Sequence, residues 1–287
     1  MSKFTWEDLI SLNSKSEAWN SELSCIAHID MNAFYSQVDQ VRCGLSKDDP
    51  VVSVQWSSII AVSYAARKFG ISRMDTIESA RAKCKVLKAV HTATFKKGET
   101  FWKSPPLGEF PSPFEHKVSL DPYRREGRKV LSILQSYCDV VQKASVDEAF
   151  LDLGRLVFNL ILGDDKFIDF DSDQLAVLQP IKEMFQSNKY NLLDNLPELP
   201  KNINSFFKPI GNVIKEKGSD DLPQISDWDE LVIVFGSLIT NKIRASIIKE
   251  TTYFTSCGVS NNKSLSKIAS DFKKPDTQTI IFNKCID

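Results

Sequence analysis

One short stretch near the N-terminus, Cys25–Gln37, has the sequence CIAHIDMNAFYSQ. It begins with a run that is apolar apart from His28 and that ends at Asp30, which is typical of a buried strand with a carboxylate at its C-terminal end. Phe34 and Val38 follow at helical spacing, so we expect a helix directly after the strand. The stretch therefore predicts a strand that carries an acid to the beginning of a helix.

Two further acids, Asp147 and Glu148, lie in the middle of the chain, between strands expected at Val146 and at Ala149–Leu153. The helix before them is expected to begin at Asp121 and to include Val141. A long helix from Ser226, a strand at Tyr253–Val259, a short helix at Lys263–Asp271 and a strand at Gln278–Phe282 complete the expected elements.

The order of these elements predicts the class of fold. Without residues 35–115 and an acidic insertion at 158–225, the order is strand, helix, strand, strand, helix, strand, as in the ferredoxin-like fold. We therefore expect an α+β chain whose ferredoxin-like, antiparallel sheet carries helices on one face and has a small α/β domain inserted after the first strand. Asp30, Asp147 and Glu148 would then lie at one end of the sheet.

Three carboxylates around one point repel each other unless cations lie between them. Hard oxygen ligands suit Mg²⁺, which also takes phosphate oxygens, and two such ions can activate an attacking oxygen and stabilise a leaving oxygen. An Asp-Glu pair is also common on protein surfaces, so the acids alone are weak evidence of a metal site.

The charges of the chain are unevenly distributed, although its formal net charge is only −1. Ten basic and three acidic residues lie between Arg67 and Lys103, whereas seven basic and fourteen acidic residues lie between Phe158 and Glu230. The basic block could face a polyanion while the acidic block points elsewhere, and solvated helix faces are the simpler alternative.

Composition narrows the class of protein further. None of the six cysteines forms a C-x-x-C pair, which argues against a zinc site, and the acidic N-terminus does not resemble a signal peptide. No apolar run approaches 18 residues, so no membrane partner is expected. We expect a soluble protein of the cytosol or nucleus.

Several motifs together resemble those of the Y-family translesion DNA polymerases, with the fungal members as the nearest match. They occur in the order of that family and are CIAHIDMNAFYSQ (Cys25–Gln37), VVSVQW (Val51–Trp56), IIAVSYAARKFGISRMD (Ile59–Asp75), ASVDEAFLDL (Ala144–Leu153) and TSCGVSNNKSLSKIASDFKKP (Thr255–Pro275). Several motifs in a fixed order are far more specific than any one of them.

The resemblance implies roles for individual residues. Asp30, Asp147 and Glu148, with the backbone carbonyl of Met31, match the ligands of two Mg²⁺ ions, for which Mn²⁺ could substitute. Tyr35 matches the aromatic residue that excludes a 2′-hydroxyl. The whole set expected to bind the incoming dNTP is Phe34, Tyr35, Tyr64, Arg67, Arg73 and Lys274, and the set on the template side is Gln55, Trp56, Ile60 and Met74.

Ordinary structural roles remain open for these positions. Phe34 and Tyr35 would also suit the core of the first helix, and Lys274 would suit a loop. Trp56, Ile60 and Met74 would suit an apolar core about as well as a template contact.

The resemblance also implies a domain organisation. Residues 1–34 and 104–287 match the palm, with the acidic insertion at about 158–225, and residues 35–103 match the fingers. The thumb and little finger are expected to be absent. Contacts with a sliding clamp and with ubiquitin are expected only in the missing C-terminal part.

The function implied is templated nucleotidyl transfer past ultraviolet-damaged DNA, notably thymine dimers, in the nucleus. The partners would be primer-template DNA and a dNTP. Two alternatives remain: a palm-type nucleotidyl cyclase, which needs no template, and a non-catalytic fragment that binds DNA or a partner.

Overall fold

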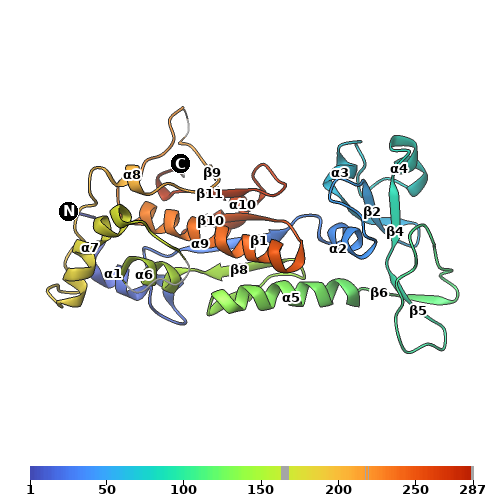
Figure 1. Ribbon diagram of the computed structural model, residues 1–287, viewed down its shortest axis with the longest axis horizontal. Helices are drawn as coiled ribbons and strands as arrows, with labels where there is room; N and C mark the ends of the chain where they lie inside the picture. The colour runs from blue at the N-terminus through green and yellow to red at the C-terminus, as the bar shows by residue number, and fades with distance from the viewer. Residues whose placement is uncertain (163–167, 217, 219, 286–287) are drawn as a thin grey trace. The chain divides into compact units, whose positions relative to one another are not determined.

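The computed structural model describes residues 1–162, 168–216, 218 and 220–285 (Figure 1). They form two compact units. The first unit comprises Met1–Asp30, Leu131–Glu250 and Phe254–Asp287, and the second unit comprises Met31–Val130 and Thr251–Tyr253.

The first unit is built on a six-stranded sheet. Its strands, in spatial order, are β7 (Val140–Lys143), β8 (Glu148–Asp152), β1 (Ile26–Met31), β10 (Thr255–Ser260), β11 (Gln278–Ile280) and β9 (Asn212–Val213). The pairs β7–β8 and β8–β1 are antiparallel, whereas β10–β11 and β11–β9 are parallel.

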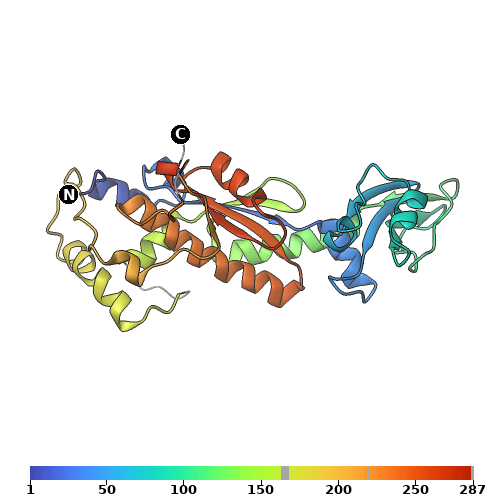
Figure 2. The same ribbon diagram turned by 90° about the horizontal axis from the view of Figure 1, so that it is seen from above.

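Helices cover both faces of this sheet (Figure 2). Successive strand residues point to opposite faces. On β10, Val259 lies under α9 (Trp228–Thr251), close to Gly236, and Gly258 lies under α10 (Lys263–Asp271). A Cβ at Gly258 would overlap the carbonyl oxygen of Ser266, so this glycine allows α10 to lie directly on the strand.

Helix α9 is the core helix of the first unit. Among the described residues it alone is long and apolar enough to cross a membrane, and 67% of that apolar window is buried. A helix that is apolar on every side is buried in a core or in a membrane, and here the protein itself covers most of it.

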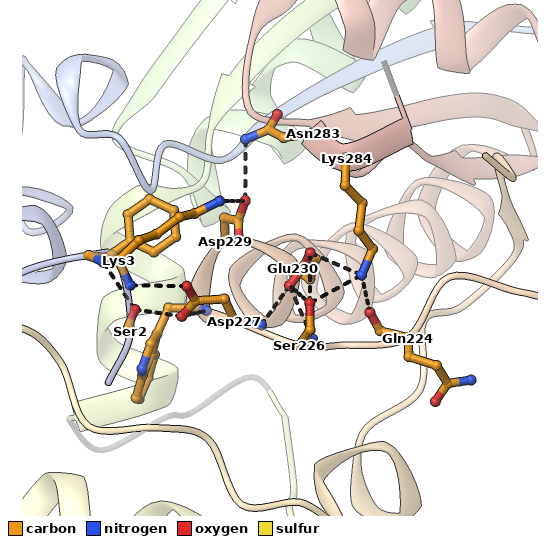
Figure 3. A network of polar contacts seen from close by, with 11 residues as sticks. Ser2, Lys3, Gln224, Ser226, Asp227, Asp229, Glu230, Asn283 and Lys284 are labelled. Atoms are coloured by element: carbon orange, nitrogen blue, oxygen red, sulfur yellow. Dashed lines mark hydrogen bonds and ion pairs between the residues drawn. The ribbon is translucent and has the colours of Figure 1, made fainter. Parts of the chain in front are cut away.

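A polar network surrounds the beginning of α9 (Figure 3). The backbone N–H groups of Ser226 and Asp227 donate to the Glu230 carboxylate over 3.1 and 2.7 Å, and Lys284 Nζ lies 3.1 Å from Glu230 Oε1. Lys3 pairs in the same region with the buried Asp229. The acid that caps this helix is therefore Glu230. Residues near both ends of the described chain, Lys3 and Lys284, pair with acids at the beginning of α9.

The insertion is only partly a surface feature. It begins within α6 (Gly154–Leu162) and contains α7 (Ser172–Gln186), α8 (Ile203–Phe206) and β9. Phe207 packs edge-on against Phe235 of α9, with the ring centroids 4.9 Å apart. Residues 163–167 of the insertion lie outside the described residues.

The second unit contains a three-stranded sheet with the order β3-β2-β4 and a separate hairpin. Its elements are α2 (Phe34–Arg42), β2 (Val51–Gln55), β3 (Ser58–Val62), α3 (Tyr64–Arg67), α4 (Ile77–Lys83), β4 (Lys88–His91), β5 (Ala93–Lys96) and β6 (His116–Ser119). Valines and isoleucines of β2 and β3 form its core with Ala80, Cys84 and Leu87.

The predicted α+β class and the ferredoxin-like order of elements are confirmed. Several details are corrected. Helices cover both faces of the sheet, whereas they were expected on one face. Helix α5 (Asp121–Tyr137) ends before Val141, which instead lies in β7 opposite Leu151, and Val146 lies in the turn before β8. The sheet is also not wholly antiparallel, because β11 and β9 extend it with parallel pairs.

The substitution Gly258→Ala should destabilise the first unit, because α10 would have to move away from β10. We expect the free energy of unfolding in urea to fall by about 2 kcal/mol, as in other overpacked cores. The control is Ile268→Ala on the exposed side of α10, which should cost less than about 0.5 kcal/mol. Equal stability of Gly258→Ala and the native chain would contradict this close packing.

Candidate active site

Two acids face each other across neighbouring strands of the first unit. Asp30, near the end of β1, is the register partner of Glu148, the first residue of β8. They meet because β1 and β8 are antiparallel, so the end of one lies beside the beginning of the other. Asp147 directly precedes Glu148 in the turn before β8.

Hydrogen bonds hold that turn in place. Ser145 Oγ accepts from the backbone N–H groups of Asp147 and Glu148 over 3.1 and 3.0 Å. Its hydroxyl donates to Asp147 Oδ1 over 2.5 Å. Ser145 therefore fixes the direction in which the two acids leave the strand.

The acids influence one another electrostatically. The pKa of Asp30 is raised, mainly by burial, and the negative charges of Glu148 and Asp147 add to this effect, while Lys274 opposes it. The pKa of Glu148 is lowered: burial raises it, but the hydrogen bond and charge of Lys267 outweigh burial. Asp30 is thus close enough to both other carboxylates to be influenced by their charge.

Two lysines contact the acidic pair. Lys274 Nζ lies 2.6 Å from Asp30 Oδ2 and 2.6 Å from Asp271 Oδ1. Lys267 Nζ lies 2.7 Å from Glu148 Oε2. The sequence singled out Lys274 but not Lys267.

The buried His28 is a second neighbour of Glu148, with 3.7 Å between Nε2 and Glu148 Oε2. Its Nδ1 lies 2.7 Å from Ser270 Oγ, and burial lowers the pKa of the imidazole to about 4. A neutral His28 therefore links β1 to α10 and adds no charge to the acids.

No three His, Cys, Asp or Glu side chains within the described parts of the chain are placed to hold a metal ion as they stand. Asp30 and Glu148 face lysines instead, and Asp147 is held by Ser145. The donor chemistry nevertheless fits Mg²⁺, because hard carboxylate oxygens from two adjacent strands share one electrostatic neighbourhood. Met31, whose carbonyl was expected to join them, is the last residue of β1.

In the second unit, the expected dNTP-binding residues begin with α2. Phe34 is buried and packs edge-on against Tyr253. Tyr35 is half-buried and stacks on Tyr123, with ring centroids 4.1 Å apart and an interplanar angle of 15°. Phe34 is therefore a core residue here, whereas Tyr35 has one face fixed by a neighbouring ring.

The Tyr123 ring is in turn held by a buried acid. Its hydroxyl donates to Asp39 Oδ2 over 3.0 Å. The same carboxylate accepts from Ser53 Oγ over 2.5 Å and from Arg42 over 3.2 Å. Burial raises the pKa of Asp39 to about 6, although Arg42, Ser53 and Tyr123 favour the ionised form.

The remaining dNTP-binding candidates of the second unit lie on α3 and the turn that follows. The Arg67 guanidinium lies 4.2 Å from the centre of the Tyr64 ring, and its Nε donates to the Val62 carbonyl. Arg73 is exposed in the turn that leads to α4. The guanidinium groups of Arg67 and Arg73 and the ring of Tyr64 therefore come from α3 and the turn directly after it.

The template-side candidates lie around the β2–β3 turn. Gln55, Trp56 and Ile60 are half-buried, and the Trp56 backbone N–H donates to His91 Nε2 over 3.0 Å. Met74 is 93% exposed, which excludes a core role for it in this structure.

Comparison with known proteins shows the family of the chain. Residues 29–271 match the impB/mucB/samB family, and the chain belongs to that family. The earlier resemblance to Y-family polymerases is thereby confirmed.

Individual relatives are similar over almost the whole chain. DNA polymerase eta of Saccharomyces cerevisiae is 51% identical over 100% of this chain and 46% of its own length. N-acetyltransferase eso1 of Schizosaccharomyces pombe is 36% identical over 99% of this chain and 30% of its own length. The chain thus spans less than half the length of either relative.

A solved structure supports the fold. DinB from Sulfolobus solfataricus aligns with 90% of this chain and 48% of its own, with a TM-score of 0.51 and 17% identity. At that identity the likeness concerns the fold alone.

Replacing the buried acid of the second unit should change how stability depends on pH. The folded pKa of Asp39 lies above its unfolded value of 3.8. Its contribution to the free energy of unfolding is therefore fully present below pH 4 and is lost as pH rises through about 6. Asp39→Asn should remove that loss, which amounts to as much as about 3 kcal/mol.

The measurement is the free energy of unfolding of both proteins from pH 4 to pH 7. The control is Asp49→Asn, at a half-buried acid whose pKa is lowered by hydrogen bonds from Ser46, which should leave the slope above pH 5 unchanged. Parallel profiles for Asp39→Asn and the native chain would show that Asp39 titrates normally.

Proposed function

We propose that this chain carries the palm and fingers of a DNA-directed DNA polymerase that extends a primer past damaged template bases. The observation that carries the proposal is the cross-strand pair of Asp30 and Glu148, with Asp147 beside it, at the end of a ferredoxin-like sheet. Residues 1–34 and 104–287 would be the palm and residues 35–103 the fingers.

The acids would hold the metal ions of the reaction. Asp30, Asp147, Glu148 and the Met31 carbonyl are the proposed ligands of two Mg²⁺ ions, for which Mn²⁺ could substitute. When bound, such ions would increase the reactivity of a primer 3′-hydroxyl and neutralise charge on the leaving pyrophosphate. Ser145 keeps Asp147 and Glu148 oriented for this task.

Other side chains would hold the nucleotide. Lys274, Arg67 and Arg73 supply positive charge for a triphosphate, and guanidinium groups can donate two parallel hydrogen bonds to phosphate oxygens. Tyr64 would share this role. Tyr35 would lie beneath the sugar and exclude a 2′-hydroxyl, and its stacking on Tyr123 would keep its ring from turning aside.

The β2–β3 turn would support the template base. Gln55, Trp56, Ile60 and Met74 are the proposed contacts, and small residues such as Ser57 would leave room for a thymine dimer. The similarity to a yeast DNA polymerase eta supports ultraviolet damage as the context. We also propose a nuclear location, no membrane partner, and contacts with a sliding clamp and ubiquitin outside these 287 residues.

Primer extension with Mg²⁺ tests the proposal. Asp147→Asn should lower the rate by about a hundredfold or more, since it removes one charged ligand. The control Asp173→Asn, at an exposed acid of α7, should extend primers like the native chain.

Three results would contradict the proposal. The first is equal extension by Asp147→Asn and the native chain. The second is nucleotide turnover that needs no template, as in a cyclase. The third is normal binding of primer-template DNA without extension at high protein concentration, as in a non-catalytic fragment.

A further inference from the structure

The two lysines that contact Asp30 and Glu148 come from one short segment. Lys267 lies on α10, and Lys274 lies three residues after its end. In the Lys274–Asp30 pair, the side chains are only 19% and 16% exposed, whereas the Lys267–Glu148 pair is more open. We define the lysine pair as Lys267 and Lys274.

Each ammonium group occupies one carboxylate oxygen that a metal ion could otherwise use. A carboxylate oxygen at 2.6 or 2.7 Å from an ammonium nitrogen cannot also coordinate Mg²⁺ at about 2.1 Å in the same direction. The lysine pair supplies two positive charges to three negative ones. It therefore stabilises the acids of β1 and β8 in the way that divalent metal would.

The segment that carries the lysine pair is firmly anchored. Gly258 lets α10 lie directly on β10, and Ser270 of α10 contacts the buried His28 of β1. Lys267 is thus presented by a helix fixed to the same strands as the acids, and Lys274 by the segment directly after that helix. Side-chain rotation is enough to release their ammonium groups.

We propose that Lys267 and Lys274 are resident counter-ions that compete with divalent metal for Glu148 and Asp30. Lys267 is a positioning residue in this scheme, because it acts through Glu148. The inference rests on the proposed function, since it takes these acids as metal ligands.

A phosphate-rich ligand would shift this competition. Lysine ammonium groups bind phosphate oxygens well, so a bound triphosphate would draw the lysine pair away from the acids. Metal and triphosphate would then strengthen each other's binding, because coupling between two ligands is reciprocal. Without a nucleotide, the centre would bind metal weakly and keep its acids paired.

The test is Mn²⁺ binding to the 287-residue chain without nucleotide, measured from the electron paramagnetic resonance signal of free Mn²⁺. Lys267→Met should bind Mn²⁺ about three- to tenfold more tightly, because a competing ion pair is gone. Lys267→Arg should behave like the native chain, since it keeps the charge. A residue with a merely structural role would weaken binding when replaced.

The matched control is Lys263→Met on the same helix. Lys263 Nζ lies 6.0 Å from the centre of the Phe150 ring and makes no ion pair with Glu148 in the described part of the chain. This variant removes the same charge, so its Mn²⁺ affinity should stay within about twofold of the native value.

Unchanged or weaker Mn²⁺ binding by Lys267→Met would overturn the inference. If Asp30→Asn loses Mn²⁺ binding in the same assay, the proposed function stands without the lysine competition. If Asp30→Asn binds Mn²⁺ like the native chain, the acids are not the metal ligands and both proposals fail.

Discussion

The register of β1 against β8 sets Asp30 directly opposite Glu148. Like charges in that position destabilise a sheet unless cations compensate them. In this structure the compensation comes from Lys267 and Lys274. The position of α10, the glycine beneath it and the bond from His28 to Ser270 all serve to hold those lysines beside the acids.

In the second unit, the buried carboxylate of Asp39 is also compensated by neighbouring side chains. Asp39 is surrounded by three donors, Arg42, Ser53 and the Tyr123 hydroxyl, and the Tyr123 ring supports Tyr35. A buried acid thereby fixes the aromatic ring on which sugar selection would depend. In both units, charge compensation orients the side chains to which we assign function.

Local patterns predicted the parts of the fold that depend on local sequence. The buried strand ending at Asp30, the order of the main elements and the α+β class followed from apolar runs and helical spacing, and they are confirmed. The end of α5 was placed too late, because Val141 continues the helical spacing but is taken by pairing with β8. The beginning of α9 was expected at Ser226, whereas Trp228 is its first residue and Glu230 binds the backbone N–H groups of Ser226 and Asp227.

The site residues that sequence missed act over long separations. Lys267 meets Glu148 across 119 positions, and His28 meets Ser270 across 242. No spacing rule connects such pairs. Ser145 was within reach of sequence reasoning, since a serine two residues before an acid often bonds the backbone of a turn.

Asp30 and Glu148 would pair with Lys274 and Lys267 in the absence of metal, and would coordinate the metal ions once the lysines withdraw. The most direct measurement is anomalous scattering from Mn²⁺ in crystals of the chain with primer-template DNA and a non-hydrolysable dNTP. The account predicts Mn²⁺ between Asp30 and Glu148, with both lysine nitrogens withdrawn beyond about 3.5 Å from these carboxylates. Mn²⁺ bound elsewhere, or at the acids with both lysine contacts intact, would contradict it.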